Sequence, residues 1–155
     1  MYIPGQIIAV GQAAPPSTRS ALLPTGLAFL LSTVRLRCDA GVTSDAVARR
    51  FDHLGWPGGE PVLDQLLADA GRIETLPHRS CSLSTDELVL VRAAALIGLG
   101  LDGRAINVLA EWRGDAVAIH ASLAELVETL HRAGLGFAMV FIPADRQQVS
   151  RAAPR

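Results

Sequence analysis

The sequence predicts a mostly α-helical (α+β) domain, a compact bundle of about five or six helices with short strands near the two ends of the chain. Apolar residues recur at helical spacing through most of the chain, and glycines, prolines and capping residues divide that pattern into segments. The clearest runs typical of strands lie at 6–10 and 137–142, where they could pair and close the bundle. The alternative is a small α/β domain with a strand–helix–strand C-terminal half.

Size and hydropathy indicate one domain that covers residues 1–155 and associates with other chains. The 155 residues match the usual length of a single domain. Half of them are hydrophobic and the mean hydropathy is +0.31. Because apolar surface that does not fit into one small core tends to form an interface, the composition favours a homo-oligomer over a lone monomer.

The N-terminal part of the chain predicts a strand, a loop and a helix. Residues 1–20 hold the short strand and a loop that is rich in proline and polar residues. A helix is expected over 24–40, because apolar residues recur at helical spacing and Gly41 provides a stop. Alternation at 34–38 leaves a strand there as a rival interpretation.

Two further helices and a connector follow. Thr43 or Ser44 caps a helix that extends to about Leu54. The glycine-rich and proline-containing segment 55–59 breaks the chain before a helix over 60–70. Residues 72–83 are expected to be a connector.

The next part of the sequence begins with a capping box, Ser84-Thr-Asp-Glu87, which opens a highly apolar helix over 88–99. Capping and dipole effects explain Asp86 and Glu87 better than a catalytic carboxylate pair does. A short helix is expected over 104–112.

The last part of the chain allows two interpretations. Residues 116–133 have helical spacing, but a second capping box at 122–125 also permits a strand at 116–121 before a shorter helix. The strand expected at 137–142 is followed by a polar tail, 144–155, that we expect to be frayed.

The charges and the hydropathy profile argue against nucleic acid and membrane partners. Fifteen acidic and fourteen basic residues are mixed along the chain without the basic stripe of a nucleic-acid-binding protein. All the basic residues are arginine, which is typical of a GC-rich bacterial genome. The most apolar window, 22–34, is shorter than the roughly 20 residues that span a bilayer. Since no signal peptide is evident, we expect a cytoplasmic protein.

Three glycines, Gly98, Gly100 and Gly103, have the G-x-G-x-x-G spacing of dinucleotide-binding turns. That motif requires a preceding strand, whereas the capping box before it predicts a helix. We therefore expect a helix–helix turn and assign no cofactor, with these glycines as weak candidates.

His78 and Cys81 are three residues apart on the connector, a spacing at which both could bind a metal ion. A structural zinc site needs four ligands, and no second close pair of suitable residues is present. The two residues remain weak candidates for a metal-binding protein or a small enzyme, and no metal ligand or catalytic residue is assigned.

Residues 44–70 have the outline of a helix-turn-helix, with Arg49 and Arg50 available for phosphates. The second helix is acidic, however, and it carries no basic residue to place against DNA. A DNA-binding regulator is therefore an alternative only.

The function that the sequence favours is a non-enzymatic helical interaction protein, such as an adaptor, accessory or regulatory subunit. Trp56 and Trp112, each near the end of a predicted element, are candidate anchors for a partner. Arg49 and Arg50 are the other candidate contact residues. The expected partner is another protein or a second copy of the chain.

Overall fold

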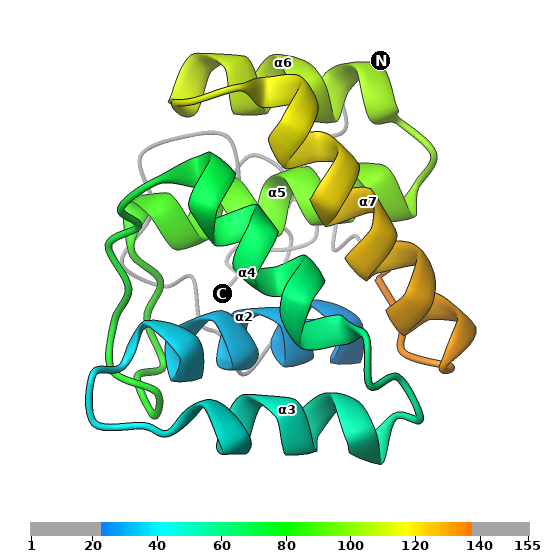
Figure 1. Cartoon of the computed structure of the whole chain (residues 1–155). Coiled ribbons are helices and arrows are strands. Elements are labelled where there is room, and N and C mark those ends of the chain that lie inside the picture. Colours follow the sequence, from blue (N-terminus) through cyan, green and yellow to red (C-terminus); the bar gives the residue numbers. More distant parts are fainter. Residues whose placement is uncertain (1–22, 138–155) are drawn as a thin grey trace, which may run out of the picture.

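The computed structural model of the chain describes residues 23–137, and over this range it is a bundle of helices (Figure 1). The helices are α2 (Thr25–Cys38), α3 (Ser44–His53), α4 (Gly59–Ala70), α5 (Thr85–Gly98), α6 (Asp102–Trp112) and α7 (Ala116–Arg132). The helical part of the prediction is confirmed. No strand occurs within residues 23–137, the strand expected at 6–10 and the tail at 144–155 lie outside them, and of 137–142 only Phe137 is described, outside any strand.

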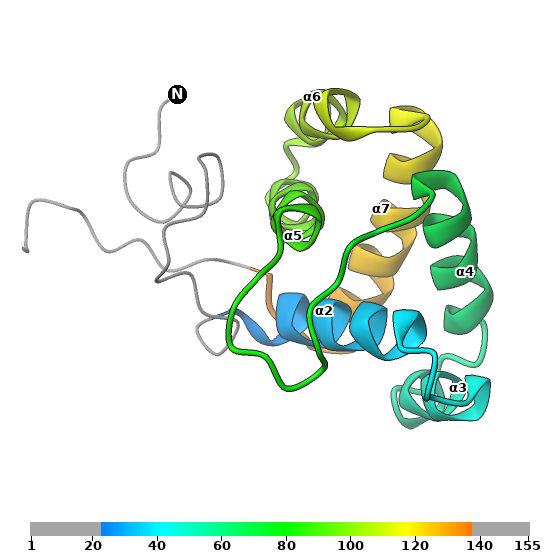
Figure 2. The same ribbon diagram turned by 90° about the vertical axis from the view of Figure 1, so that its left-hand side faces the viewer.

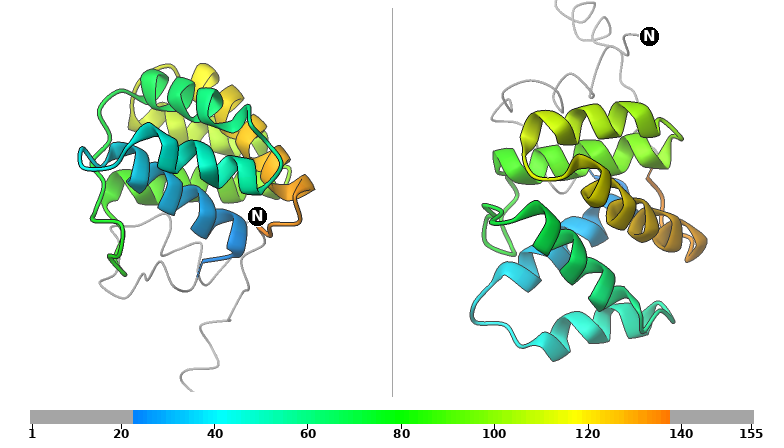
Figure 3. Two further views of the ribbon diagram at one scale, coloured as in Figure 1. Left: turned by 60° about the horizontal axis from the view of Figure 1, so that its bottom comes forward. Right: turned by 45° about the horizontal axis from the view of Figure 1, so that its top comes forward.

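Helix α7 holds the bundle together. It packs on α2, α4, α5 and α6, while α3 lies at one end against α2 and α4. Helix α6 lies at the other end, against α5 and α7 (Figure 2). The connector between α4 and α5 runs along the outside, beside the C-terminal end of α2 and the start of α5 (Figure 3).

The core is aliphatic, and leucine dominates it. Helices α2, α4, α6 and α7 direct fully buried leucines inward, and α5 contributes alanines that let its neighbours approach closely. The side chains with no exposed surface include Leu27, Leu63, Leu66, Leu109, Ile119, Leu123 and Leu126. The pattern of apolar residues at helical spacing therefore identified most of the inward-facing positions.

The strand predicted as one possibility at 116–121 is wrong, and with it the α/β alternative. Asp115 caps α7: its Oδ1 accepts hydrogen bonds from the amides of Val117 and Ala118, so the helix begins at Ala116. The competing capping box at 122–125 lies inside the same helix, where Ser122 is buried. The stretch 34–38 likewise belongs to helix α2.

Helix boundaries differ from the predicted ones by one to three residues, with the largest difference at the start of α5, Thr85 instead of residue 88. Helix α2 ends at Cys38 instead of residue 40, α4 begins at Gly59, and α6 begins at Asp102. Thr43 takes the N-cap position before α3, as expected, although its side chain makes no capping hydrogen bond.

The segment that follows α7 contacts the first turn of α2 at Gly26. The Gly26 amide donates to the carbonyl of Gly136 (2.7 Å), and the Gly136 amide donates to Oγ1 of Thr25 (2.9 Å). A Cβ on Gly26 would lie 2.4 Å from the ring of Phe137, so only glycine allows this contact. Residues that follow α7 are thus held against the first turn of α2.

Candidate functional site

The first turn of α5 organises the polar interior of the molecule. The predicted capping box is confirmed: the Glu87 amide donates to Oγ of Ser84 (3.1 Å), and the Ser84 amide donates to Oε2 of Glu87 (2.8 Å). Ser84 Oγ also donates to the carbonyl of Glu74 at 2.6 Å. The cap therefore fastens the connector to α5 as well as starting the helix.

Glu87 has a second role that the capping pattern did not reveal. Its carboxylate forms a two-pronged ion pair with Arg35 of α2, with Nε–Oε1 at 2.7 Å and Nη2–Oε2 at 2.9 Å. Both side chains are buried, at 2% and 0% exposure. Glu87 also accepts from the Leu76 amide, and Arg35 donates to the carbonyl of Ser80. The pair therefore fixes the connector against α2 and α5.

The neighbouring carboxylate, Asp86, faces the other side of the connector. It accepts from the Glu74 amide (2.7 Å), from Nε1 of Trp112 (2.9 Å) and from Nη2 of Arg113 (2.6 Å). Burial by itself raises the pKa of Asp86, but these hydrogen bonds and the Arg113 charge outweigh it and lower the pKa. Asp86 is therefore a stable carboxylate that ties the end of α6 to the connector.

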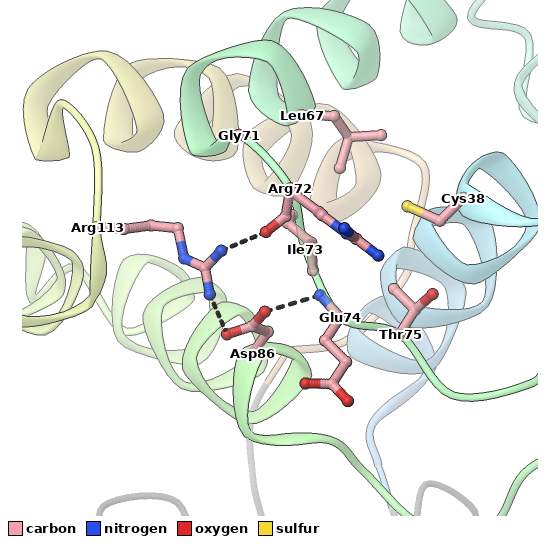
Figure 4. A pocket seen from close by; sticks show the side chains of 9 residues that line it. All are labelled: Cys38, Leu67, Gly71, Arg72, Ile73, Glu74, Thr75, Asp86 and Arg113. Carbon is pink, nitrogen blue, oxygen red and sulfur yellow. Dashed lines mark hydrogen bonds and ion pairs between the residues drawn. The ribbon is translucent and has the colours of Figure 1, made fainter.

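A pocket of about 810 Å³ opens beside Asp86 (Figure 4). The C-terminal ends of α2 and α4, the start of the connector, the first turn of α5 and the residue after α6 all contribute to it. Its lining residues are Cys38, Leu67, Gly71, Arg72, Ile73, Glu74, Thr75, Asp86 and Arg113. We call this cavity the Arg72 pocket.

Of the two arginines in this pocket, Arg72 is the one without a side-chain partner among the described residues. Arg113 is engaged twice, since it pairs with Asp86 and donates to the backbone carbonyl of Arg72. Within residues 23–137 the Arg72 guanidinium makes no hydrogen bond or ion pair. Figure 4 shows it extending toward Cys38 and Thr75. Arg72 is exposed, so its guanidinium can bind an anion that another molecule brings to the pocket.

The thiol of Cys38 borders the same space. Burial raises the pKa of Cys38, and the charge of Glu87 adds to that increase. The Arg37 guanidinium and the Thr75 hydroxyl act in the opposite direction without cancelling it. Cys38 is therefore a poor nucleophile at neutral pH, but its sulfur lies toward the pocket and can report on occupancy.

His78 and Cys81 lie on the exposed side of the connector. Both side chains are exposed, and no hydrogen bond joins them. No group of three or more histidine, cysteine, aspartate or glutamate residues arranged to hold a metal ion occurs within residues 23–137. The structure thus leaves these two weak candidates apart from the Arg72 pocket.

The three glycines of the G-x-G-x-x-G match belong to a turn between helices. Gly98 is the last residue of α5, Gly100 has a φ of 73° in the turn, and Gly103 lies inside α6. The segment that precedes the motif is a helix, not a strand. The context that phosphate binding by this motif requires is therefore missing.

The candidate contact residues of 44–70 are mostly engaged within the protein. Arg50 donates to Ser32 Oγ (2.6 Å) and its guanidinium lies 5.0 Å from the centre of the Phe29 ring. Burial lowers the pKa of Arg50. Arg49 is exposed and donates to the carbonyl of Asp45. Only Arg49 of the two arginines thus projects into solvent.

The two tryptophans have different surroundings. Trp56 packs edge-on against Phe51, with ring centres 5.4 Å apart, and lines a smaller pocket of about 260 Å³ beside the end of α7. Trp112 is half-buried behind Asp86, and Arg113 lies over its ring. Trp112 thus supports the Arg72 pocket, although the sequence suggested only that it could be an anchor.

The sequence reasoning missed Arg72, Asp86 and Arg113 as site residues. The signal that was available is slight: Arg72 directly follows the glycine that ends α4, and Arg113 directly follows the last residue of α6. Cations at such places serve a helix C-terminus equally well. Only the fold brings these residues together.

Comparison with known proteins identified no relative of this chain. No family model matches the chain, and neither a curated protein nor a solved structure shows significant similarity to it. Among the described helices, none combines the length and the apolar character needed to cross a membrane.

Proposed function

We propose that this chain is a non-enzymatic interaction protein, an adaptor, accessory or regulatory subunit, and that it holds an anionic group of its partner in the Arg72 pocket. The partner is another protein or a second copy of the chain. The observation that carries the proposal is the Arg72 guanidinium, which has no hydrogen bond or ion pair within residues 23–137 and lines a pocket of about 810 Å³.

The state of the other polar groups supports a contact function over a catalytic one. Asp86 and Arg113 satisfy each other, and burial raises the pKa of Cys38. No hydrogen bond links Cys38 or Cys81 to a histidine within the described residues, and a nucleophile–base pair requires such a bond. We therefore assign the paired groups to stabilising the fold and Arg72 to contact with a partner.

The acidic surface of α4 gives the DNA-binding alternative no support. Glu60, Asp64 and Asp69 all lie on that helix, where Asp64 pairs with Arg37. An element placed against phosphates should carry the opposite charge.

The proposal is tested by native mass spectrometry of the full chain, purified from the cells in which it naturally occurs, with a metal scan on the same sample. We expect a complex of defined stoichiometry with a protein partner or with a second copy. The variant Arg72→Gln should lose that complex. Arg79→Gln is the matched control, because Arg79 is an exposed arginine on the same connector but outside the pocket.

Two results would contradict the proposal. One is a complex that the Arg72→Gln variant retains as well as the wild-type chain does. The other is a monomer that carries a metal ion or a nucleotide, which would redirect attention to His78 and Cys81, or to the glycine turn.

A further inference from the structure

We propose that the Arg72 pocket selects a single carboxylate group over a phosphate, and that the carboxylate comes from an acidic side chain or the chain terminus of a partner polypeptide. This inference rests on the proposed function, because it names the chemistry of the group that the partner inserts. The charges, the hydrogen bonds and the walls of the pocket each support it.

The charges around the pocket leave one positive charge to neutralise. Arg113 and Asp86 form a pair, and Asp86 stays ionised at neutral pH. The Glu74 side chain is exposed and extends away from the Arg72 guanidinium in Figure 4. A carboxylate neutralises Arg72 alone, whereas a phosphate brings a second negative charge into a pocket that Asp86 also lines. Like charges in one pocket disfavour binding, so the pocket is matched to a monoanion.

Two amides of the connector are engaged inside the protein and do not face a bound anion. Phosphate sites usually present several free backbone amides to the anion. Here the Glu74 amide donates to Asp86 and the Leu76 amide donates to Glu87. The Thr75 hydroxyl, which also lines the pocket, interacts with the Cys38 thiol. The flat Arg72 guanidinium suits the two coplanar oxygens of a carboxylate.

The walls indicate that the carboxylate is part of a larger organic group. Leu67 and Ile73 give the pocket apolar surface next to the cation. Its volume, about 810 Å³, is far larger than a carboxylate needs and lies in the range of known ligand sites. A side chain or a chain end fits this description better than a free inorganic ion does.

Alkylation of the two cysteines by neutral iodoacetamide, followed by mass spectrometry, measures occupancy in the native chain. Both cysteines are exposed, but Cys38 borders the pocket and Cys81 lies outside it, so Cys81 is an internal control. The probes are acetyl-leucyl-alanine with a free carboxyl terminus, the same peptide amidated, acetyl-leucyl-glutamic acid diamide, acetate and inorganic phosphate. Each probe is titrated at constant ionic strength.

We expect a carboxylate-bearing peptide to slow alkylation of Cys38 but not of Cys81. Inorganic phosphate should require at least about tenfold higher concentration, and Arg72→Gln should weaken protection by the peptide at least about tenfold, as loss of a charge-assisted hydrogen bond does. Arg79→Gln should leave protection unchanged. Protection by the free-terminus peptide alone identifies a chain end, and protection by the glutamyl peptide alone identifies an acidic side chain.

Three results overturn the inference: phosphate protects as well as the peptides, the amidated peptide without a carboxylate protects equally, or acetate is as effective as the peptides. The last result would point to a free small acid. These failures are distinguishable from failure of the proposed function. A complex that depends on Arg72 together with a preference for phosphate leaves the interaction function standing and removes only the carboxylate.

Discussion

Two adjacent carboxylates at the start of α5 have opposite kinds of surroundings. Glu87 faces inward, is fully buried, and uses both oxygens on Arg35 and on two backbone amides. Asp86 faces the pocket and is held by Arg113, whose own side chain is 37% exposed. The groups around Glu87 satisfy one another, whereas Asp86 borders a pocket in which the Arg72 side chain has no partner from the described part of the chain.

Within one helical turn, Glu87 therefore stabilises the fold, whereas Asp86 borders the proposed binding pocket. A buried charge must be paired to be tolerated, so the Glu87 network serves the fold. The groups around Asp86 satisfy one another but leave Arg72 open, so that side of the turn is available for binding. The substitutions below test this division, and the expected effects run from the largest to the smallest.

Replacement of Glu87 by alanine should have the largest effect on stability. Removal of one member of a buried ion pair leaves an uncompensated charge, here on Arg35, and costs about 3–5 kcal/mol of the free energy of unfolding. Urea denaturation measures this loss. The control is Glu128→Ala, which removes an exposed pair with Arg132 and should cost less than about 1 kcal/mol. Equal effects of the two substitutions would refute the distinction.

Replacement of Asp86 by alanine should cost less, about 1.5–3 kcal/mol, which is typical for hydrogen bonds to a charged group. The loss should also depend on pH. Because the folded-state pKa of Asp86 is lowered, Asp86 stabilises the fold above its unfolded-state pKa, about 3.9, and this contribution disappears as the pH falls through the folded-state pKa. Wild type and variant should therefore converge in acid. A stability difference that is constant from pH 7 to low pH would be inconsistent with this account.

Replacement of Ser84 by alanine removes the N-cap of α5 and its bond to the Glu74 carbonyl. We expect a loss of about 1 kcal/mol, because N-cap serines contribute on that order. Thermal unfolding followed by circular dichroism measures it. Thr43→Ala is a matched control, since the Thr43 side chain makes no capping hydrogen bond before α3. A larger loss for Thr43 than for Ser84 would contradict the assignment.

Replacement of Arg72 by glutamine should have the smallest effect on stability, within about 0.5 kcal/mol, because its guanidinium is exposed and makes no hydrogen bond or ion pair within residues 23–137. Urea denaturation of the free protein checks this directly. A loss as large as that of Asp86→Ala would mean that Arg72 is structural, and the reason to regard the pocket as a binding site would be gone.

Much of the fold could be predicted because its signals are local. Apolar spacing and the stops around it located the helices, and the capping box at Ser84 marked the start of α5. The ambiguity at 116–121 arose because two capping signals lay close together, and the Asp115 cap is the one that forms. The sequence pattern does not show which of two neighbouring N-cap signals forms, because tertiary packing decides between them.

The candidate site could not be predicted because its contacts are not local. Arg35 and Glu87 are 52 residues apart, and Arg113 reaches Asp86 across 27. The sequence suggested that the first two acids of α5 serve its cap and its dipole, which describes only part of what Glu87 does. Arg72 stands out because its side chain has no partner among the described residues, and a sequence does not show which arginines are paired in the fold.

The contact between Gly136 and the first turn of α2 has a consequence for the order in which the molecule is completed. Thr25 and Gly136 are 111 residues apart, and Phe137 covers Gly26. Synthesis proceeds from the N-terminus, so α2 emerges before every other described helix, yet its first turn gains these partners only after α7 has been made. On the ribosome, the first turn of the earliest described helix is therefore among the last parts to gain its partners.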